Sequence, residues 1–212
     1  MAGGSELLDL EAFAATPLER EPFPHLVVPR FLRAEAMAGL VEDFPRIGKP
    51  GSFPVSTLSF GPRFGALLEA LEGPAMRAAF AAKFEMDLAD RPTMVTVRGR
   101  AQAKDGRIHA DSKSKLITVL LYMNAGWEAP GGRLRLLRRP DSLADYVAEV
   151  PPVEGTLIAF KVTPNSWHGH EPVEGERRVI QLNWVRDEKV ARHEEARHRL
   201  SARLKQLFAR AS

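Results

Sequence analysis

The second half of the chain is divided into short apolar segments by glycine and proline, and this pattern constrains the fold most strongly. From Pro92 onward the segments are rich in β-branched residues or alternate between apolar and polar side chains. Such segments are typical of antiparallel strands in a jelly roll or barrel. We therefore expect a mainly β protein with flanking helices (α+β). The predicted strands cover residues 94–98, 115–123, 133–137, 156–160 and 178–185.

The first half of the chain and its end have a different pattern, which predicts helices. Leu32, Ala36 and Leu40 recur at the spacing of one helix face, and Gly73-Pro74 interrupts a longer helical stretch. A segment rich in Gly, Pro and Ser between these helices indicates a long loop, of the kind that often serves as a lid. The expected elements are a short strand at 23–29, helices at 31–43, 64–87 (in two parts) and 187–209, and a loop at 45–62.

Composition limits the chemistry that the chain can perform. None of the 212 residues is cysteine, so a metal must be bound by His, Asp or Glu, and disulfides, thiolate catalysis and Fe–S clusters are excluded. No apolar run approaches the roughly 20 residues that cross a bilayer, and the N-terminus does not have the pattern of a signal peptide. We therefore expect a cytoplasmic protein.

The basic character of the chain is concentrated at its C-terminal end. The sequence pI is about 9.4 and the net charge is +3. Residues 186–212 contain eight Lys/Arg and four Asp/Glu, a net of +4, so residues 1–185 carry about −1. Because the body of the protein is close to neutral, we expect no nucleic-acid partner.

Three residues have the identities and spacing of a metal site. His109 and Asp111 are two residues apart, so an extended segment directs both side chains to one face. His168 can supply a third ligand from a distant strand. Two histidines and one carboxylate form the facial triad of non-haem Fe(II) oxygenases, which leaves positions open for co-substrates. His-x-Asp alone is weak support, because a polar strand end gives the same pattern.

A cation and a tyrosine are candidates for binding an anion near such a metal. Arg178 follows His168 after a turn rich in Gly, Pro and Glu, and an arginine directed into a barrel requires an anionic partner. The pattern leaves open that Arg177 or Arg178 forms only a surface ion pair with a nearby glutamate. Tyr122 ends an apolar strand and can donate to the same anion, although packing in the core explains it equally well.

Residues 94–186 resemble the 2-oxoglutarate- and Fe(II)-dependent dioxygenases, specifically the prolyl-4-hydroxylase-like branch. The resemblance is carried by His109-x-Asp111, followed by Leu-Ile-Thr-Val-Leu-Leu-Tyr-Met-Asn at 116–124 and Gly-Gly-Arg-Leu-Arg-Leu at 131–136. It continues with His168-x-x-x-Pro172-Val173 and Arg178, in the order and at separations comparable to those of the family.

The resemblance implies a double-stranded β-helix (jelly-roll) core within one domain of residues 1–212. Residues from about 1 to 90 would form helical support and a lid loop. Residues 91–186 would form the core, and residues 187–212 would form a C-terminal helix. Fe(II) would be bound by His109, Asp111 and His168; the distance to Pro172-Val173 favours His168 over His170.

The resemblance also implies that Arg178 binds the C5 carboxylate of 2-oxoglutarate, with Tyr122 as a second donor. The spacing to Trp184 favours Arg178 over Arg177, and Arg178 would share the barrel interior with Ile180, Leu182 and Trp184. The strand before His109 has no tyrosine at the place where the family usually has one. Gln102 or Arg100 would then substitute, and we assign Gln102 to the co-substrate pocket.

The implied activity is hydroxylation of an unactivated C–H, with succinate and CO2 as co-products and with Fe(II), 2-oxoglutarate and O2 as cofactors; ascorbate is a candidate reductant. The carboxylate at Asp111 favours hydroxylation over halogenation. A protein or peptide side chain is the leading substrate, a small metabolite the alternative, and a non-catalytic β-barrel binding module the non-enzyme alternative. A homodimer and the absence of a membrane partner are further expectations.

Overall fold

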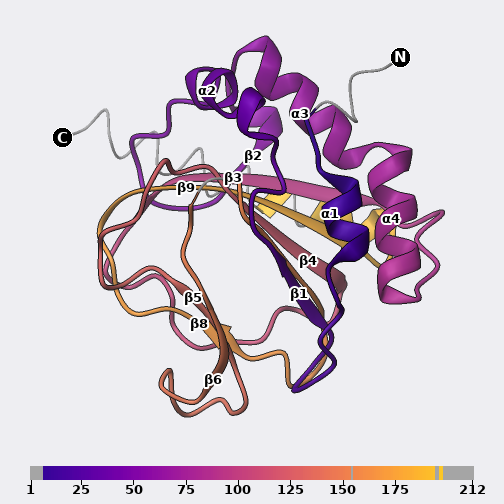
Figure 1. Cartoon of the computed structure of the whole chain (residues 1–212), viewed down its shortest axis with the longest axis vertical. Helices are drawn as coiled ribbons and strands as arrows, with labels where there is room; N and C mark the ends of the chain where they lie inside the picture. Colours follow the sequence, from indigo (N-terminus) through magenta and orange to yellow (C-terminus); the bar gives the residue numbers. More distant parts are fainter. Residues whose placement is uncertain (1–6, 154, 194–195, 198–212) are drawn as a thin grey trace.

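The computed structural model describes residues 7–153, 155–193 and 196–197. Among the described residues, four short helices lie in the first part of the chain, most strands lie in the second, and a helical segment begins at residue 188 (Figure 1). The helices are α1 (Leu10–Ala15), α2 (Ala34–Glu42), α3 (Pro62–Glu72) and α4 (Pro74–Phe84), with a 3-10 turn η1 (Val55–Thr57). The strands are β1 (His25–Val28), β2 (Phe53–Pro54), β3 (Thr93–Ala101), β4 (Lys115–Tyr122), β5 (Leu134–Leu137), β6 (Tyr146–Val150), β7 (Leu157–Lys161), β8 (His168–Gly169) and β9 (Gly175–Val185).

The strands form two antiparallel sheets. The large sheet has the order β1-β7-β4-β9-β3-β2, and the small sheet has the order β6-β5-β8. In the large sheet, Asn183 on β9 lies between Thr118 on β4 and Met94 on β3. The expected mainly β architecture with antiparallel sheets and flanking helices is therefore present.

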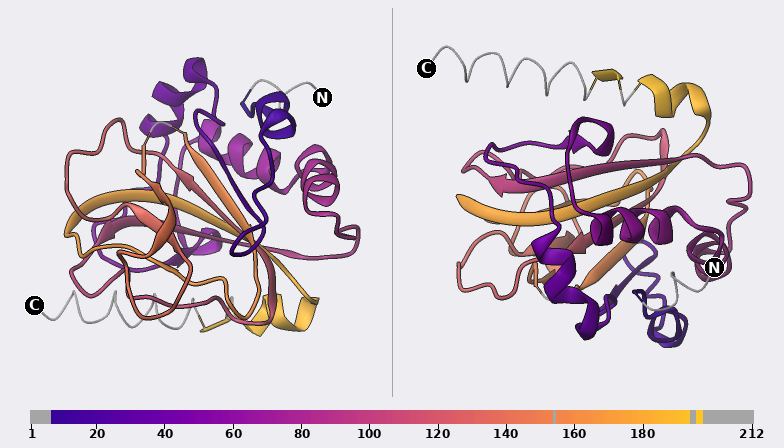
Figure 2. Two further views of the ribbon diagram at one scale, coloured as in Figure 1. Left: turned by 60° about the horizontal axis from the view of Figure 1, so that its bottom comes forward. Right: turned by 90° about the horizontal axis from the view of Figure 1, so that it is seen from above.

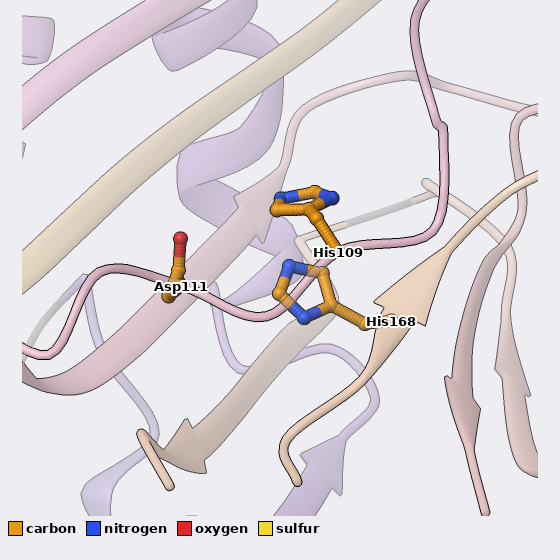
Figure 3. A group of neighbouring side chains, drawn as sticks. All are labelled: His109, Asp111 and His168. Atoms are coloured by element: carbon orange, nitrogen blue, oxygen red, sulfur yellow. The ribbon is translucent and has the colours of Figure 1, made fainter. Parts of the chain in front are cut away.

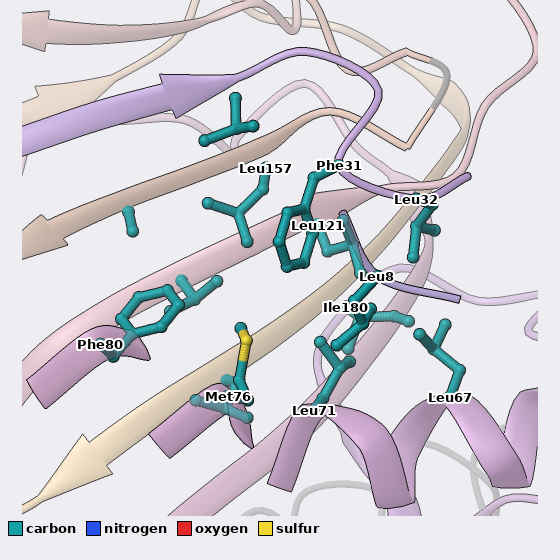
Figure 4. Close-up of a cluster of buried hydrophobic side chains, with 14 of the residues drawn as sticks. Leu8, Phe31, Leu32, Leu67, Leu71, Met76, Phe80, Leu121, Leu157 and Ile180 are labelled. Atoms are coloured by element: carbon teal, nitrogen blue, oxygen red, sulfur yellow. The ribbon is translucent and has the colours of Figure 1, made fainter. Parts of the chain in front are cut away.

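The helices cover one face of the large sheet and enclose the main apolar cluster (Figure 4). Ile180, Leu182 and Trp184 on β9 pack there against helix residues such as Leu71 and Phe80. The ring centroids of Trp184 and Phe80 are 4.7 Å apart. Figure 2 shows the helices of the first part of the chain, drawn in purple, beside this sheet. This face of the sheet is thus occupied by structural packing.

The opposite face of the large sheet packs against the small sheet. A second apolar cluster there joins Leu134 and Leu136 of β5 to Ile158 and Phe160 of β7, together with Tyr122 at the end of β4. Because β5 pairs with β8 through Leu136 and His168, this packing places His168 over the large sheet. The small sheet thereby closes an interior space between the two sheets.

The expected elements agree with the structure except in detail. Gly73-Pro74 separates α3 from α4, because Pro74 occupies the first position of the second helix. The expected loop at 45–62 contains β2 and η1, and three further elements were not expected: α1, β6 and β8. Residues 188–193 and 196–197 are helical, and the rest of the expected C-terminal helix lies outside the described residues. No described helix is long and apolar enough to cross a membrane.

Candidate active site

The three predicted metal ligands meet between the two sheets (Figure 3). One potential ligand atom from each of His109, Asp111 and His168 lies within 4.8 Å of the other two. His109 and His168 are backbone partners in an antiparallel bridge, and their ring centroids are 4.3 Å apart. The His-x-Asp segment is thus held against the small sheet, and its two side chains face His168.

Backbone carbonyls fix the orientation of both imidazole rings. The Nδ1 atom of His109 lies 2.8 Å from the carbonyl oxygen of Arg107, and that of His168 lies 2.9 Å from the carbonyl oxygen of Ser166. A carbonyl only accepts, so each Nδ1 carries the proton and each Nε2 has a free lone pair for a metal. Burial, together with the nearby His109, lowers the pKa of His168 to about 4, so its ring is neutral at pH 7.

Asp111 is the carboxylate of the cluster and is held ionised. Lys115 Nζ donates to its Oδ1 at 2.8 Å, and the Thr118 hydroxyl donates to its Oδ2 at 2.5 Å. Asn183 in turn donates to the Thr118 hydroxyl at 2.8 Å. Burial raises the pKa of Asp111, but the attraction of Lys115 and His168 and the two hydrogen bonds outweigh burial and hold this pKa below its usual value. A neutral histidine and an ionised aspartate are the forms that bind a metal.

The cluster opens into a cavity of about 220 Å³ between the sheets. Apolar walls are contributed by Leu120, Leu134 and Val179. The charged and ionisable side chains around the cavity are mostly basic: Arg98, Lys115, Arg177, Arg197 and the histidines 109, 168 and 170, with Asp111 as the one acidic residue among the described lining residues. Residues 1–185 are close to neutral in total, but the charged side chains that they place around this cavity are mostly basic. Arg197, from the basic C-terminal segment, also lines it.

The structure places Arg177, and not Arg178, in this cavity. Arg177 is 7% exposed, and its Nε donates to the carbonyl oxygen of Gly132 at 3.0 Å. Among the described residues, no carboxylate lies within ion-pair distance of it. Arg178 points to the other side of β9, where it forms an ion pair with Glu176 at 2.9 Å and lies over the Phe44 ring. The predicted orientation of Arg178 is wrong, because the face of Ile180, Leu182 and Trp184 packs on the helices.

Tyr122 lies directly beside Arg177. The guanidinium carbon of Arg177 is 5.3 Å from the centroid of the Tyr122 ring. The tyrosine is fully buried, and within the described part of the chain its hydroxyl has no hydrogen-bond partner. Burial raises the pKa of Tyr122, so its hydroxyl stays protonated and is a donor. A buried polar atom without a partner is costly, and an anion bound beside Arg177 would supply the missing acceptor.

Gln102 lies outside the residues that line the cavity. Its side-chain amide and its backbone N–H bond the Asp105 carboxylate at 3.3 and 3.2 Å. Arg100, the other residue considered for this place, is exposed. Instead Arg98 lines the cavity from β3, with Asp105 3.7 Å from its guanidinium. Burial lowers the pKa of Arg98; the Asp105 carboxylate opposes this effect, and the charge of Arg177, which lines the same cavity, adds to it.

His170 is in the cavity but outside the metal-ligand cluster. Its Nδ1 lies 2.8 Å from the carbonyl oxygen of Glu171, and burial and the charge of Arg177 lower its pKa to about 4. Arg98, Lys115 and Arg177 also line the cavity, although the sequence pattern did not predict this. A usable signal existed, because polar residues alternate on β9 at Gln181 and Asn183, in phase with Arg177.

Comparisons with known proteins agree with this geometry. Residues 99–186 match the model of the 2OG-Fe(II) oxygenase superfamily. A prolyl-4-hydroxylase from Pseudomonas putida superposes with a TM-score of 0.56 at 20% identity, covering 88% of this chain and 93% of that one. A prolyl 4-hydroxylase from Phytophthora capsici superposes with a TM-score of 0.55 at 16% identity, covering 89% of this chain and 65% of that one. The viral collagen prolyl hydroxylase of Paramecium bursaria Chlorella virus 1, solved with 2OG, superposes with a TM-score of 0.50 at 15% identity, covering 77% of this chain and 95% of that one.

No curated protein matches the chain. The superfamily match nevertheless confirms the resemblance seen in the sequence for residues 99–186, and the structural similarity shows a common fold over most of the chain. The matched residues are therefore similar to the 2OG-Fe(II) oxygenase superfamily, and the chain shares the fold of the prolyl hydroxylases named above. Enzymes of that superfamily use Fe(II), 2-oxoglutarate as co-substrate, and O2, and the cluster of His109, Asp111 and His168 has the donor set that such an iron needs.

Proposed function

We propose that His109, Asp111 and His168 bind Fe(II), and that Arg177 with Tyr122 binds the distal carboxylate of 2-oxoglutarate. One observation carries this assignment: the cavity that contains the metal-ligand cluster also contains a buried guanidinium without a carboxylate partner among the described residues. A buried charge is stable only when it is paired, and arginine binds carboxylates through two parallel hydrogen bonds. The hydroxyl of Tyr122 supplies a further donor at the same place.

We further propose that the enzyme hydroxylates a C–H of a protein or peptide side chain. Iron and 2-oxoglutarate, when bound, supply the activation of O2, with succinate and CO2 as co-products. The protein holds both imidazoles through backbone carbonyls and orients Asp111 through Thr118, and Leu120, Leu134 and Val179 form the apolar part of the cavity wall. Support for a peptide-linked substrate comes from the names of the similar structures, which are prolyl hydroxylases.

Several broader assignments belong to this proposal. Residues 91–186 would form a double-stranded β-helix within a single domain of residues 1–212, with two antiparallel sheets enclosing the cavity as support. A cytoplasmic location is a prediction, as are ascorbate as a reductant and a homodimer. None of these affects the chemistry assigned to the cavity.

Anaerobic titration with Fe(II) and 2-oxoglutarate, followed by measurement of succinate release in air, tests the proposed function. The wild type should show the charge-transfer band of the iron–2-oxoglutarate pair and slow succinate release without a prime substrate. His109→Ala should weaken iron binding by more than about 100-fold, because a ligand is lost directly. The matched control His193→Ala, at an exposed position of the C-terminal segment, should behave as the wild type. A wild type with neither band nor succinate would indicate a non-catalytic binding module.

A further inference from the structure

Lys115 is a largely buried cation next to the metal-ligand cluster, and the proposed function does not use it. Its side chain is 14% exposed, lines the cavity, and places Nζ 2.8 Å from Asp111 Oδ1. Its backbone is fixed, because Lys115 begins β4 and its N–H donates to the carbonyl oxygen of Ser112 at 2.9 Å. A lysine held at this depth requires an anionic partner whenever the protein is folded.

Metal binding would compete with Lys115 for its present partner. Both oxygens of Asp111 already accept a hydrogen bond, Oδ2 from Thr118 and Oδ1 from Lys115, so a metal bound to this carboxylate would share it with both donors. A divalent cation and an ammonium group at one carboxylate repel each other. Lys115 would then be directed into the cavity, since its stem is fixed at the start of the strand.

The other charges of the loaded cavity do not supply a new partner for Lys115. Asp111 is the one carboxylate among the described lining residues. Arg98 is already paired with Asp105. In the proposed function, one carboxylate of 2-oxoglutarate is bound by the metal and the other by Arg177. Lys115 is therefore left as a surplus positive charge beside the reacting centre.

We propose that Lys115 binds an anionic group of the prime substrate, a carboxylate or a phosphate, close to the carbon that is oxidised. This inference rests on the proposed function and assigns its substrate class: an acidic molecule or an acidic side chain. An ammonium on a flexible stem acts as a point charge and accepts either anion, so the chemistry of the partner is defined but its source is not. A residue that only oriented Asp111 would change metal affinity and would not distinguish acids from their neutral counterparts.

The experiment uses protein loaded with Mn(II) and 2-oxoglutarate, which should bind substrates without turning over. Binding is measured by calorimetry and by the shift of the melting temperature. The probes are matched pairs: common L-amino acids and their carboxamides, acidic peptides and their Asn or Gln counterparts, and phosphoserine and serine. The variants are Lys115→Gln, Lys115→Arg and the control Lys113→Gln, an exposed lysine of the same segment. Lys115→Met replaces Lys115→Gln if the latter does not fold.

We expect the wild type to bind at least one acid about tenfold or more tightly than its neutral counterpart, the size of a hydrogen bond to a charged group. Lys115→Gln should lose this preference, whereas Lys115→Arg and Lys113→Gln should retain it. The probe pair that shows the preference identifies the source of the anion. Equal binding of acids and neutral counterparts, or a preference that survives in Lys115→Gln, would overturn the inference alone. Failure of the wild type to bind Mn(II) and 2-oxoglutarate would overturn the proposed function as well.

Discussion

The two faces of strand β9 differ in composition and in what covers them. Ile180, Leu182 and Trp184 face the helices and are at most 1% exposed. Arg177 and Gln181 face the cavity, together with Val179 and Asn183. One strand thus separates a face that stabilises the fold from a face that contains the chemistry. The apolar face is the scaffold, and the mixed face is the interior of the site.

This difference implies that mutations on alternate residues of β9 should have separable effects. A residue on the helix face contributes through buried apolar area and close packing, so its loss lowers the free energy of unfolding. A residue on the cavity face contributes a charge or a hydrogen bond that is completed only when a ligand binds. Substitutions on the helix face should therefore change mainly the free energy of unfolding, and substitutions on the cavity face mainly ligand binding.

The largest effect on stability is expected at Trp184. Trp184→Ala should lower the free energy of unfolding by about 3–5 kcal/mol, because it removes a fully buried ring that packs against Phe80. The matched cavity-face variant Gln181→Ala should cost about 1 kcal/mol or less, since it removes a part-buried polar side chain. Denaturant unfolding of both variants measures the contrast, and similar losses would show that the two faces are not distinct.

A smaller, pH-dependent effect is expected from the cavity face. The pKa values of His168 and His170 are lowered to about 4 in the folded protein, whereas an unfolded histidine titrates near 6.5. Between these values the unfolded chain binds more protons, so stability is lost as the pH falls from about 6.5 to about 4. Each histidine accounts for up to about 3 kcal/mol of this loss in the free energy of unfolding.

Unfolding of the metal-free protein at several pH values measures this loss. His170→Gln should reduce the slope in this window, because one of the two lowered groups is removed. The same slope in the variant and the wild type would contradict the role of His170. The stability lost through Trp184→Ala, in contrast, should not depend on pH.

Much of the fold could be predicted from the sequence, because alternating apolar and polar residues indicate strands, and Gly and Pro end strands and helices. The long strands β3, β4 and β9 and the break between α3 and α4 follow from these signals. Strand β6 gave no comparable signal, since its side chains are mostly half-exposed and apolar and polar residues are not cleanly separated. The two-residue strand β2 gave none either, because pairing with β3 forms it and its own composition does not.

The site was only partly predictable for a different reason. The spacing of His109 and Asp111 and the family resemblance at His168 predicted that the three side chains meet, and the structure brings them together. The choice of Arg178 over Arg177 depended on which face of β9 is interior. An apolar face was taken as the barrel interior, but here both faces of the sheet are covered, and the more apolar one packs on helices. Sequence alternation separates two faces and does not identify the face that lines the site.

The affinity of the Mn(II)-loaded protein for 2-oxoglutarate, compared between Arg177→Met and Arg178→Met, tests the central assignment most directly. Arg177→Met should weaken 2-oxoglutarate binding by about 10- to 100-fold, because a buried charge-assisted contact to a carboxylate is lost. Arg178→Met should leave the affinity within about twofold, because its exposed ion pair with Glu176 is on the helix side of the sheet. A strong loss in Arg178→Met together with an unchanged affinity in Arg177→Met would contradict the account.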